Sequence, residues 1–271
     1  MEALHLDKLG YRYPDQTQAL DDINLKVDVG ERMALIGPNG AGKSTLLNIM
    51  AGLYLPTVGS LKIMGELVTK KNMVTARTNV GLLFQDPDDQ IFMPTVWDDV
   101  AFGPINMGLD QATVEERVAE AMEMTGIKGY EQRVPHHLSF GEKKRVAIAG
   151  VLAMKPSILL LDEPTANLDP QGRKDLMEIL DSLEATQVFA THDLSVAFEL
   201  TEKAVVLMRN IIFQGTFRDL VERPDILKGA NLELPPLSRV MAEWRRKGGK
   251  DFEIPLTTDE ALQLLQRECS K

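Results

Sequence analysis

The sequence has little cysteine and no long apolar run. A single cysteine, Cys269, stands among 271 residues, so no disulfide can form within the chain, as is typical of a reducing compartment. No run approaches the roughly 18 consecutive apolar residues that a membrane-spanning helix needs, and the most apolar stretch, SILLLD, is far too short. The first residues, MEALHLDKLGYRYPD, mix acidic and basic side chains, so we expect no signal peptide. Any membrane span must then come from a partner.

Positive charge is also in short supply. The chain has 30 Lys and Arg residues against 40 Asp and Glu residues, so its net charge is -10 at pH 7. This balance argues against a general nucleic-acid binder, and we expect no nucleic-acid partner. Apolar residues at 44% and charged residues at 26% are ordinary for a soluble globular protein. The length permits one large domain or two smaller ones, with a full-sized core.

Short apolar runs typical of buried strands alternate with helical patterns up to about residue 222. Strands are expected at 32–36, 79–84, 157–161, 187–190 and 204–207. Apolar residues that include Val114 and Val118 recur at helical spacing within 111–124, which predicts an amphipathic helix. Asp169 and Pro170 suit the N-cap and the first position of a helix that includes LMEILDSL. Strands that alternate with helices predict an α/β fold with a largely parallel sheet.

The composition changes after about Glu222. Four prolines, a basic cluster WRRKGGK and two short helical patterns follow, LSRVMAEWRRK and DEALQLLQRE. Such a mixture predicts a small helical extension instead of a linker, with amphipathic faces that can pack on the main domain or on another subunit. We therefore divide the chain into a main domain, residues 1–222, and a C-terminal helical extension, residues 223–271.

A glycine-rich stretch between the first of these strands and a helical pattern matches a phosphate-binding loop. Its sequence GPNGAGKST fits G-x-x-x-x-G-K-[ST] in the strand–loop–helix context that the motif needs. Glycines let the backbone curl so that several N–H groups point at one anion, and the helix that follows adds its positive end. Lys43 then reaches the β- and γ-phosphates and the Ser44 hydroxyl ligates Mg²⁺, so the loop predicts binding of ATP and Mg²⁺. The candidate nucleotide-binding residues are Gly37, Asn39, Gly40, Ala41, Gly42, Lys43, Ser44 and Thr45.

Two carboxylates end another expected strand, in the run ILLLDE. In an open parallel sheet, ligands bind at the carboxyl ends of the strands, where the phosphate loop also lies. Asp162 is therefore a candidate magnesium ligand, acting through water, and Glu163 is a candidate base that polarises the attacking water. Two acids after a strand can also simply begin a turn, but a phosphate loop in the same chain favours the catalytic interpretation.

His192 and Gln85 each follow a further expected strand. His192 comes after QVFAT and can hydrogen-bond the γ-phosphate while keeping Glu163 and the water aligned. Gln85 comes after NVGLLF and can reach both the metal and the attacking water. A lone histidine or glutamine at such a position is more often structural. With the phosphate loop present, we treat both as candidate catalytic residues and Gln85 also as a candidate metal ligand.

The stretch LSFGE, residues 138–142, lies just before the helix-prone run KKRVAIAG. It belongs to an ordered series: Tyr13 first, then GPNGAGKST, Gln85, LSFGE, LLLDEP, ANLD and His192. This series resembles the nucleotide-binding domain of ABC transporters across about residues 3–222. The resemblance implies a P-loop ABC-type ATPase fold, with a mixed sheet core, a helical subdomain and an antiparallel β subdomain. It also implies that the chain hydrolyses ATP.

The resemblance implies further contacts with the nucleotide. In the family the signature LSGGQ opens a helix and contacts the γ-phosphate of ATP held by the opposite subunit, and Ser139 and Gly141 fill the two contact positions here. Tyr13 should stack on adenine; the alternative is a tyrosine packed in a β-hairpin, because Tyr11 is nearby. Asp169 should lie at the dimer interface, linking the two ATP sites.

Phe140 and Glu142 depart from the usual signature. Phe140 requires that its position has no positive φ, because only glycine adopts that conformation freely. Glu142 brings a negative charge near the start of a helix, which suits the helix dipole. The same charge would weaken ATP contact if it faced the phosphate, and the sequence leaves these two outcomes open.

Several stretches resemble more narrowly the ATPase subunits of energy-coupling-factor transporters. FQDPDDQIF looks like the extended glutamine loop of that group, and LELPPLSRVMAEWRRKGG with PLTTDEALQLL resembles its C-terminal extension, which helps the ATPases to dimerise. HHLSFGEKKRVAIAGVLAM looks most like the cobalt-type subunit. The implied function is to power uptake of a transition-metal ion, cobalt first, with nickel or a vitamin as the alternatives.

The implied assembly is a head-to-tail dimer at the cytoplasmic face of the cell membrane, a homodimer with a paired heterodimer as the alternative. Its partners are a membrane-embedded coupling subunit and a substrate-binding membrane subunit, and the loop after Gln85 passes opening and closing to them. Competing hypotheses are the ATPase of a conventional importer, a soluble ABC ATPase acting on ribosomes or DNA, and a kinase or GTPase that shares only the phosphate loop. The chain has no second cassette, and LSFGE followed by LLLDEP argues against the last class.

Overall fold

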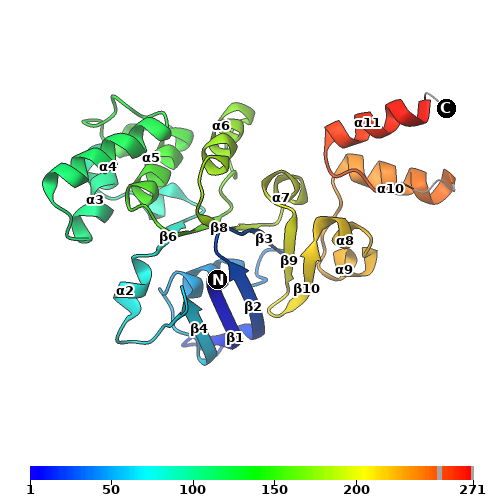
Figure 1. The fold of residues 1–271 in the computed structure, drawn as a ribbon, viewed down its shortest axis with the longest axis horizontal. Coiled ribbons are helices and arrows are strands. Elements are labelled where there is room, and N and C mark those ends of the chain that lie inside the picture. Colours follow the sequence, from blue (N-terminus) through cyan, green and yellow to red (C-terminus); the bar gives the residue numbers. More distant parts are fainter. Residues whose placement is uncertain (249–251, 270–271) are drawn as a thin grey trace.

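The structure, a computed structural model, describes residues 1–248 and 252–269. Two β-sheets, a group of helices and a C-terminal helical extension make up the fold (Figure 1). The central sheet has the strand order β10-β9-β3-β8-β7-β6, and its neighbours are parallel except for β10, which runs antiparallel to β9. Its strands are β3 (Arg32–Ile36), β6 (Val80–Leu83), β7 (Ile158–Asp162), β8 (Thr186–Thr191), β9 (Lys203–Leu207) and β10 (Ile211–Thr216).

The central sheet confirms the predicted α/β fold and its largely parallel strands. Strand β3 has the predicted bounds, and the other four predicted strands match β6, β7, β8 and β9 to within about one residue at each end. Strands β7 and β8 are buried along their whole length. Strands covered on both faces read as continuous apolar runs, which is why the sequence located them.

A second, antiparallel sheet has the order β2-β1-β4-β5. Helix α1 packs between the two sheets, and its Leu46 and Leu47 share one core with Leu4 of β1 and Leu160 of β7. The loop from β1 to β2 carries Tyr13, so this sheet brings an aromatic side chain to the edge of the phosphate loop. The bounds are β1 (Glu2–Arg12), β2 (Gln18–Asp28), α1 (Lys43–Met50), β4 (Val58–Ile63) and β5 (Glu66–Leu67).

A helical group covers one end of the central sheet and forms a second core (Figure 1). Helix α4 (Gln111–Met124) has the predicted bounds, because its buried face follows the helical spacing of its apolar residues. Helix α3 was not predicted; it starts after the N-cap Thr95 and contains Pro104. The other bounds are α2 (Met73–Arg77), η1 (Pro87–Asp89), α3 (Val96–Asn106), η2 (Pro135–His137) and α5 (Phe140–Ala153).

Strand β8 has a helix on each side of it in the chain. Helix α6 (Pro170–Asp181) starts as predicted: the Asp169 side chain accepts a hydrogen bond from the Gly172 N–H at 2.6 Å, and Pro170 is the first helical residue. Helix α7 (Leu194–Leu200) follows the loop that carries His192.

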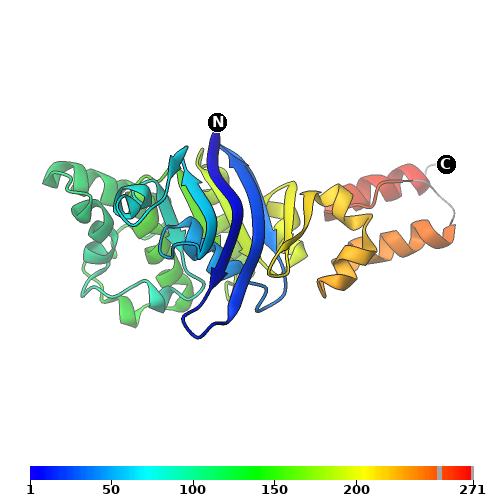
Figure 2. The same ribbon diagram turned by 90° about the horizontal axis from the view of Figure 1, so that it is seen from below.

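The chain on both sides of the predicted boundary at residue 222 is joined to the core, and so is Ile254 further along the extension. Phe217 and Leu227 share a third apolar cluster with Ile36 of β3, so helices α8 and α9 are joined to the central sheet. Helices α10 and α11 project beyond them at one end of the molecule (Figures 1 and 2). The bounds are α8 (Phe217–Val221), α9 (Pro224–Gly229), α10 (Pro236–Gly248) and α11 (Thr258–Cys269). The division between residues 222 and 223 stays a prediction. Across the described ranges, no helix is both long and apolar enough to cross a membrane.

Candidate nucleotide-binding site

The predicted phosphate loop links β3 to α1 and needs its glycines for two separate reasons. Gly42 has φ +100°, and a Cβ there would lie 2.8 Å from Leu20 Cδ2 and 2.9 Å from Ala19 O, so strain and collision both exclude a side chain. Gly40 has φ +80° with open space around it. A Cβ at Gly37 would meet the Leu207 carbonyl oxygen of β9 at 2.4 Å. The loop is therefore curled and packed tightly against its neighbours.

Lys43 lies under this loop as a buried cation. Its Nζ donates hydrogen bonds to the carbonyl oxygens of Gly37 at 2.7 Å and Pro38 at 3.2 Å. Burial lowers the pKa of Lys43, and the nearby charges of Glu163 and Asp162 oppose that shift. An ammonium group held in this way favours an anion above the loop, because a triphosphate would supply the charge that the carbonyl groups lack.

The magnesium ligands predicted from the sequence line the same cleft as the phosphate loop. The Ser44 hydroxyl donates a hydrogen bond to the Asp162 carboxylate, and Gln85 faces the same space. Burial raises the pKa of Asp162, as does the charge of Glu163, while the Ser44 hydrogen bond and Lys43 oppose the shift. A hydroxyl, a carboxylate and an amide oxygen are hard ligands of the kind that Mg²⁺ prefers, so these residues fit that ion. No cluster of three or more His, Cys, Asp or Glu side chains suited to a metal occurs in the described part of the chain.

Glu163 is held by the residues at the end of β8. Its carboxylate accepts hydrogen bonds from the Thr191 hydroxyl at 3.0 Å and the His192 backbone N–H at 3.1 Å. The His192 Nδ1 atom lies 2.7 Å from Glu163 Oε1. Glu163 has φ +44°, a conformation that is uncommon outside glycine and that is found at functional sites more than elsewhere. The structure thus brings His192 and Glu163 together, as the sequence predicted.

The cleft, of about 320 Å³, joins most of the predicted residues. Tyr13 lies at its rim, where the tyrosine hydroxyl hydrogen-bonds Thr45 Oγ1 at 2.8 Å and the ring packs edge-on against Tyr11. Two predicted residues of the phosphate loop, Gly37 and Ala41, do not line the cleft. The predicted residues that line the cleft are Tyr13, Asn39, Gly40, Gly42, Lys43, Ser44, Thr45, Gln85, Asp162 and Glu163.

The sequence interpretation missed four residues that line this cleft. Thr17, Gln18 and Ala19 come from the start of β2 and the loop before it, and Arg209 comes from the turn between β9 and β10. The Arg209 backbone N–H donates to the Ala41 carbonyl oxygen at 3.0 Å, which ties that turn to the phosphate loop. Arg209 has a φ of 68°, which is typical of a tight turn, but no sequence motif indicates that it lines the cleft.

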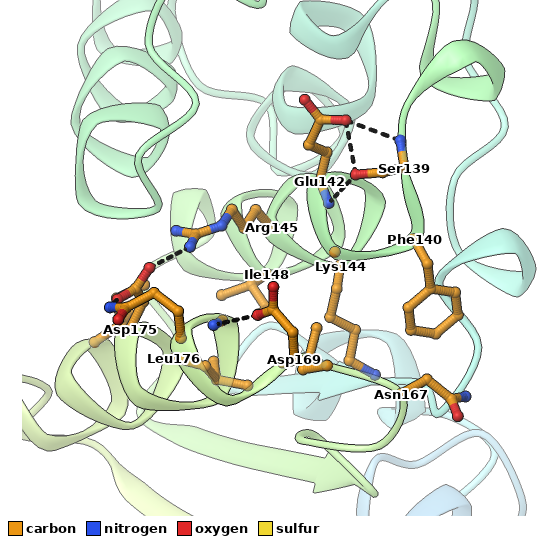
Figure 3. A pocket seen from close by; sticks show the side chains of 15 residues that line it. Ser139, Phe140, Glu142, Lys144, Arg145, Ile148, Asn167, Asp169, Asp175 and Leu176 are labelled. Carbon is orange, nitrogen blue, oxygen red and sulfur yellow. Dashed lines mark hydrogen bonds and ion pairs between the residues drawn. The ribbon is translucent and has the colours of Figure 1, made fainter.

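The signature residues lie in a second cleft, of about 470 Å³, which Asp169 also lines (Figure 3). Ser139 is the N-cap of α5, and Phe140 is its first helical residue, so the position has no positive φ, as its phenylalanine requires. A Cβ at Gly141 would find only Leu168 Cδ2 within 4 Å, at 3.9 Å. The chain's own packing therefore gives no reason for glycine at 141, whereas the close approach of a ligand would give one.

The structure shows where the charge of Glu142 points. The Glu142 carboxylate accepts hydrogen bonds from the Ser139 backbone N–H and hydroxyl, each at 2.8 Å (Figure 3). It also accepts one from the Tyr130 hydroxyl at 3.0 Å. The Ser139 backbone N–H, followed by its hydroxyl, lowers the pKa of Glu142 below its ordinary value. Glu142 thus completes a capping box with Ser139, in which each side chain bonds the other's backbone. In this structure the Glu142 charge therefore caps the start of α5, which is the first of the two outcomes that the sequence left open.

Comparisons with known proteins agree with this fold. The family described as ABC transporter matches residues 20–166. The chain is 46% identical to the energy-coupling factor transporter ATP-binding protein EcfA1 of Methanospirillum hungatei over 92% of this chain and 91% of that one. It is also 46% identical to the EcfA protein of Methanothermobacter thermautotrophicus, over 95% of this chain and 84% of that one.

Solved structures give the same result. The chain is similar to cbiO1 from Clostridium perfringens, described as part of the ABC transporter complex cbiONQ, with a TM-score of 0.75 and 38% identity over 89% of this chain and 99% of that one. It is also similar to the ATP-binding cassette MJ0796, solved as a dimer bound to ADP and Pi, with a TM-score of 0.71 and 28% identity over 79% of this chain and 99% of that one. The chain therefore belongs to the ABC transporter family and is an ATP-hydrolysing subunit of that family. Its relatives place it among the ATP-binding proteins of energy-coupling factor transporters.

Proposed function

We propose that two copies of this chain associate head to tail and power the uptake of a transition-metal ion, cobalt first, through membrane partner subunits. The main support for this dimer is that the candidate nucleotide contacts of one chain lie in two separate clefts. One contains the phosphate loop, and the other contains Ser139, Gly141 and Asp169. Contact of one triphosphate with both sets then needs a second chain. The dimer of the structural neighbour MJ0796 supports this arrangement.

In this proposal the phosphate-loop cleft holds the nucleotide from one side. Tyr13 stacks on the adenine, and its hydroxyl bond to Thr45 fixes the ring beside the loop. Lys43 exchanges its carbonyl partners for the β- and γ-phosphates. Ser44, Gln85 and, through water, Asp162 would hold Mg²⁺, and the ion would neutralise phosphate charge.

Glu163 acts as the base toward the attacking water in this proposal. Its bonds to Thr191 and to the His192 backbone hold the carboxylate at the end of β8, beside the phosphate cleft. The His192 side chain bonds the same carboxylate and is half exposed, so it can also turn toward the γ-phosphate. Ser139 and Gly141 of the opposite chain complete the contacts to that phosphate, using a hydroxyl and the N-terminus of α5.

We propose that the membrane subunit docks in an apolar groove between the sheet and the helical group. The groove, of about 550 Å³, lies beside the loop between β6 and α3 and is lined by the exposed side chains Val74, Phe92 and Phe102. Asp99 lies in it with one carboxylate oxygen buried and unpartnered, and burial raises the pKa of this group. A cytoplasmic segment with apolar side chains and one basic residue fits both features. This contact would hold the chain at the cytoplasmic face of the membrane.

We also propose that the C-terminal extension strengthens the dimer. Val240 on α10, and Leu262 and Leu265 on α11, are exposed apolar residues on helices that project from the main domain. Because α8 and α9 belong to the core, the matched test is a chain that ends at residue 234 and keeps both of these helices. The truncated chain should bind ATP as the full chain does and dimerise more weakly in sedimentation velocity. An unchanged dimer would contradict this role.

Copurification with the membrane partners, followed by transport in proteoliposomes, tests the proposed function. The complex should take up cobalt only when ATP is present on the side of the vesicle membrane where this subunit is bound. A complex with the Glu163→Gln variant should take up none. Nickel and a vitamin serve as the competing solutes in the same vesicles. Uptake of either without cobalt would revise the solute, and a chain that copurifies with no membrane protein would contradict the proposal.

A further inference from the structure

Lys144 is a buried charge for which the site described so far has no use. It lies in the second turn of α5, the helix that Ser139 caps, and only 1% of the residue is exposed. Its Nζ donates hydrogen bonds to the backbone carbonyl oxygens of Phe84 at 3.0 Å and Gln85 at 2.8 Å. Figure 3 shows the Lys144 side chain pointing away from the Glu142 carboxylate, so Lys144 and the capping box lie on different sides of α5.

The loop that Lys144 contacts is also closed onto α5 by a glutamine. The Gln90 side-chain oxygen accepts a hydrogen bond from the Phe84 N–H at 3.1 Å, and its amide nitrogen donates to the Ala147 carbonyl oxygen at 3.4 Å. Phe84 and Gln85 directly follow β6, and the Gln85 side chain lines the nucleotide cleft. The residue predicted to reach metal and water is therefore fastened, through its own carbonyl group, to the signature helix.

A buried ammonium group is costly unless its surroundings compensate it. Burial lowers the pKa of Lys144 to about 8, and the charges of Asp162, Asp86 and Glu163 oppose that shift, in that order. Two of these acids belong to the nucleotide cleft. An apolar side chain would fill the same space at a smaller desolvation cost, so the ammonium group is retained for its contacts.

We propose that Lys144 is a positioning residue for hydrolysis, which fixes the backbone of Gln85 to the signature helix and so sets the direction of the Gln85 side chain. The hydrogen bond to the Gln85 carbonyl fixes the peptide plane from which that side chain departs. Because Ser139 caps the same helix, any movement of α5 on engaging the opposite chain's ATP also moves Gln85. This inference rests on the proposed role of Gln85 in the site.

Two substitutions at this position separate the hydrogen bonds from the packing. Lys144→Met keeps the length of the side chain and removes the donors, and Lys144→Gln is shorter but keeps an N–H donor. The turnover number for ATP should fall at least about 10-fold in Lys144→Met, with the Kd for ATP within about 3-fold of wild type, because the phosphate loop is untouched. Lys144→Gln should recover part of the loss. The control is Lys155→Met, just beyond the end of the same helix, which removes an exposed ion pair with Glu120 and should keep the wild-type rate.

A double-mutant cycle with Gln85→Ala decides between a positioning role and a general loss of structure. If Lys144 acts through Gln85, Lys144→Met should cause no further fall in the turnover number when Gln85 is already alanine. Additive losses, or a Lys144→Met protein with the wild-type rate, would overturn the inference. If Lys144→Met fails to fold, the same cycle with Lys144→Gln gives the decision.

The failure of this inference is distinguishable from failure of the proposed function. If the wild-type protein hydrolyses ATP and the losses caused by Lys144→Met and Gln85→Ala are additive, the positioning role of Lys144 is overturned but the proposed function is not. A Gln85→Ala variant with the wild-type turnover number would overturn the role of Gln85 and with it that of Lys144.

Discussion

Replacing Gly141 by alanine separates a binding defect from a folding defect. Gly141 has no positive φ in α5, and an added Cβ would come no closer than 3.9 Å to Leu168 Cδ2. Alanine is preferred to glycine within helices by up to about 1 kcal/mol. A gain of that size would raise the Tm of a domain of this size by about 2–4 °C. Gly141→Ala should therefore be at least as stable as wild type in calorimetry.

The same methyl group occupies space that our account reserves for the γ-phosphate of the opposite chain's ATP. Backbone can approach a phosphate closely only where no Cβ intervenes. The ATPase rate should therefore fall at least about 10-fold, while ATP titration of the monomer should give an unchanged Kd, because the phosphate loop lies in the other cleft. Steady-state phosphate release and calorimetric titration measure the two quantities.

Gly150→Ala on the same helix is the control. A Cβ at Gly150 would lie 3.6 Å from the Asp99 carbonyl oxygen, an ordinary contact, and the residue lies outside both nucleotide-related clefts. This variant should keep the wild-type ATPase rate. Wild-type hydrolysis by Gly141→Ala would refute the role of its glycine in binding across the dimer, and so would an equal loss of ATP binding by the monomer.

Glu163→Gln should slow ATP hydrolysis by at least about 100-fold and trap an ATP-bound dimer in size-exclusion chromatography, because the amide cannot accept the water's proton; a normal rate would exclude this residue as the base. Ser139 holds the pKa of Glu142 below its ordinary 4.5, so the stabilisation by this carboxylate is present above pH 4.5 and is lost as the pH falls through the lowered pKa. Glu142→Ala should therefore cost about 0.3–1.5 kcal/mol in urea unfolding at neutral pH, and a difference from wild type that did not shrink in acid would contradict the carboxylate's part in the cap. Tyr13→Ala should weaken ATP binding about 10-fold, since a base–aromatic stack contributes about 1–3 kcal/mol. Tyr13→Phe, which loses only the bond to Thr45, should weaken it by about 3-fold or less; equal losses in the two variants would place the effect on the hydroxyl and not on the ring.

The fold was predictable where local pattern and tertiary environment agree. The strands around the phosphate loop are buried on both faces, and α4 exposes one face, so apolar runs and helical spacing located them. Helix α3 was not predicted, and it contains Gly103 and Pro104, two poor helix formers. A Cβ at Gly103 would lie 2.5 Å from Met154 Cγ, so this glycine is there for helix packing, which a single sequence does not reveal.

The site was predictable where its residues form a continuous motif or follow a strand. The phosphate loop, Asp162 and Glu163 have such local signals, and the structure brings them to one cleft. Arg209 has none, because it reaches the cleft through the pairing of β9 with β3. Lys144 has no local signal either, because its burial depends on the loop after β6 folding over it.

The central claim is that each triphosphate is held between two chains. The measurement that tests it most directly is an experimental structure of the Glu163→Gln variant with ATP and Mg²⁺. We predict that residues 37–45 of one chain and Ser139 with Gly141 of the other contact the same γ-phosphate. A triphosphate bound by one chain alone, with residues 138–142 of every chain remote from it, would contradict the account.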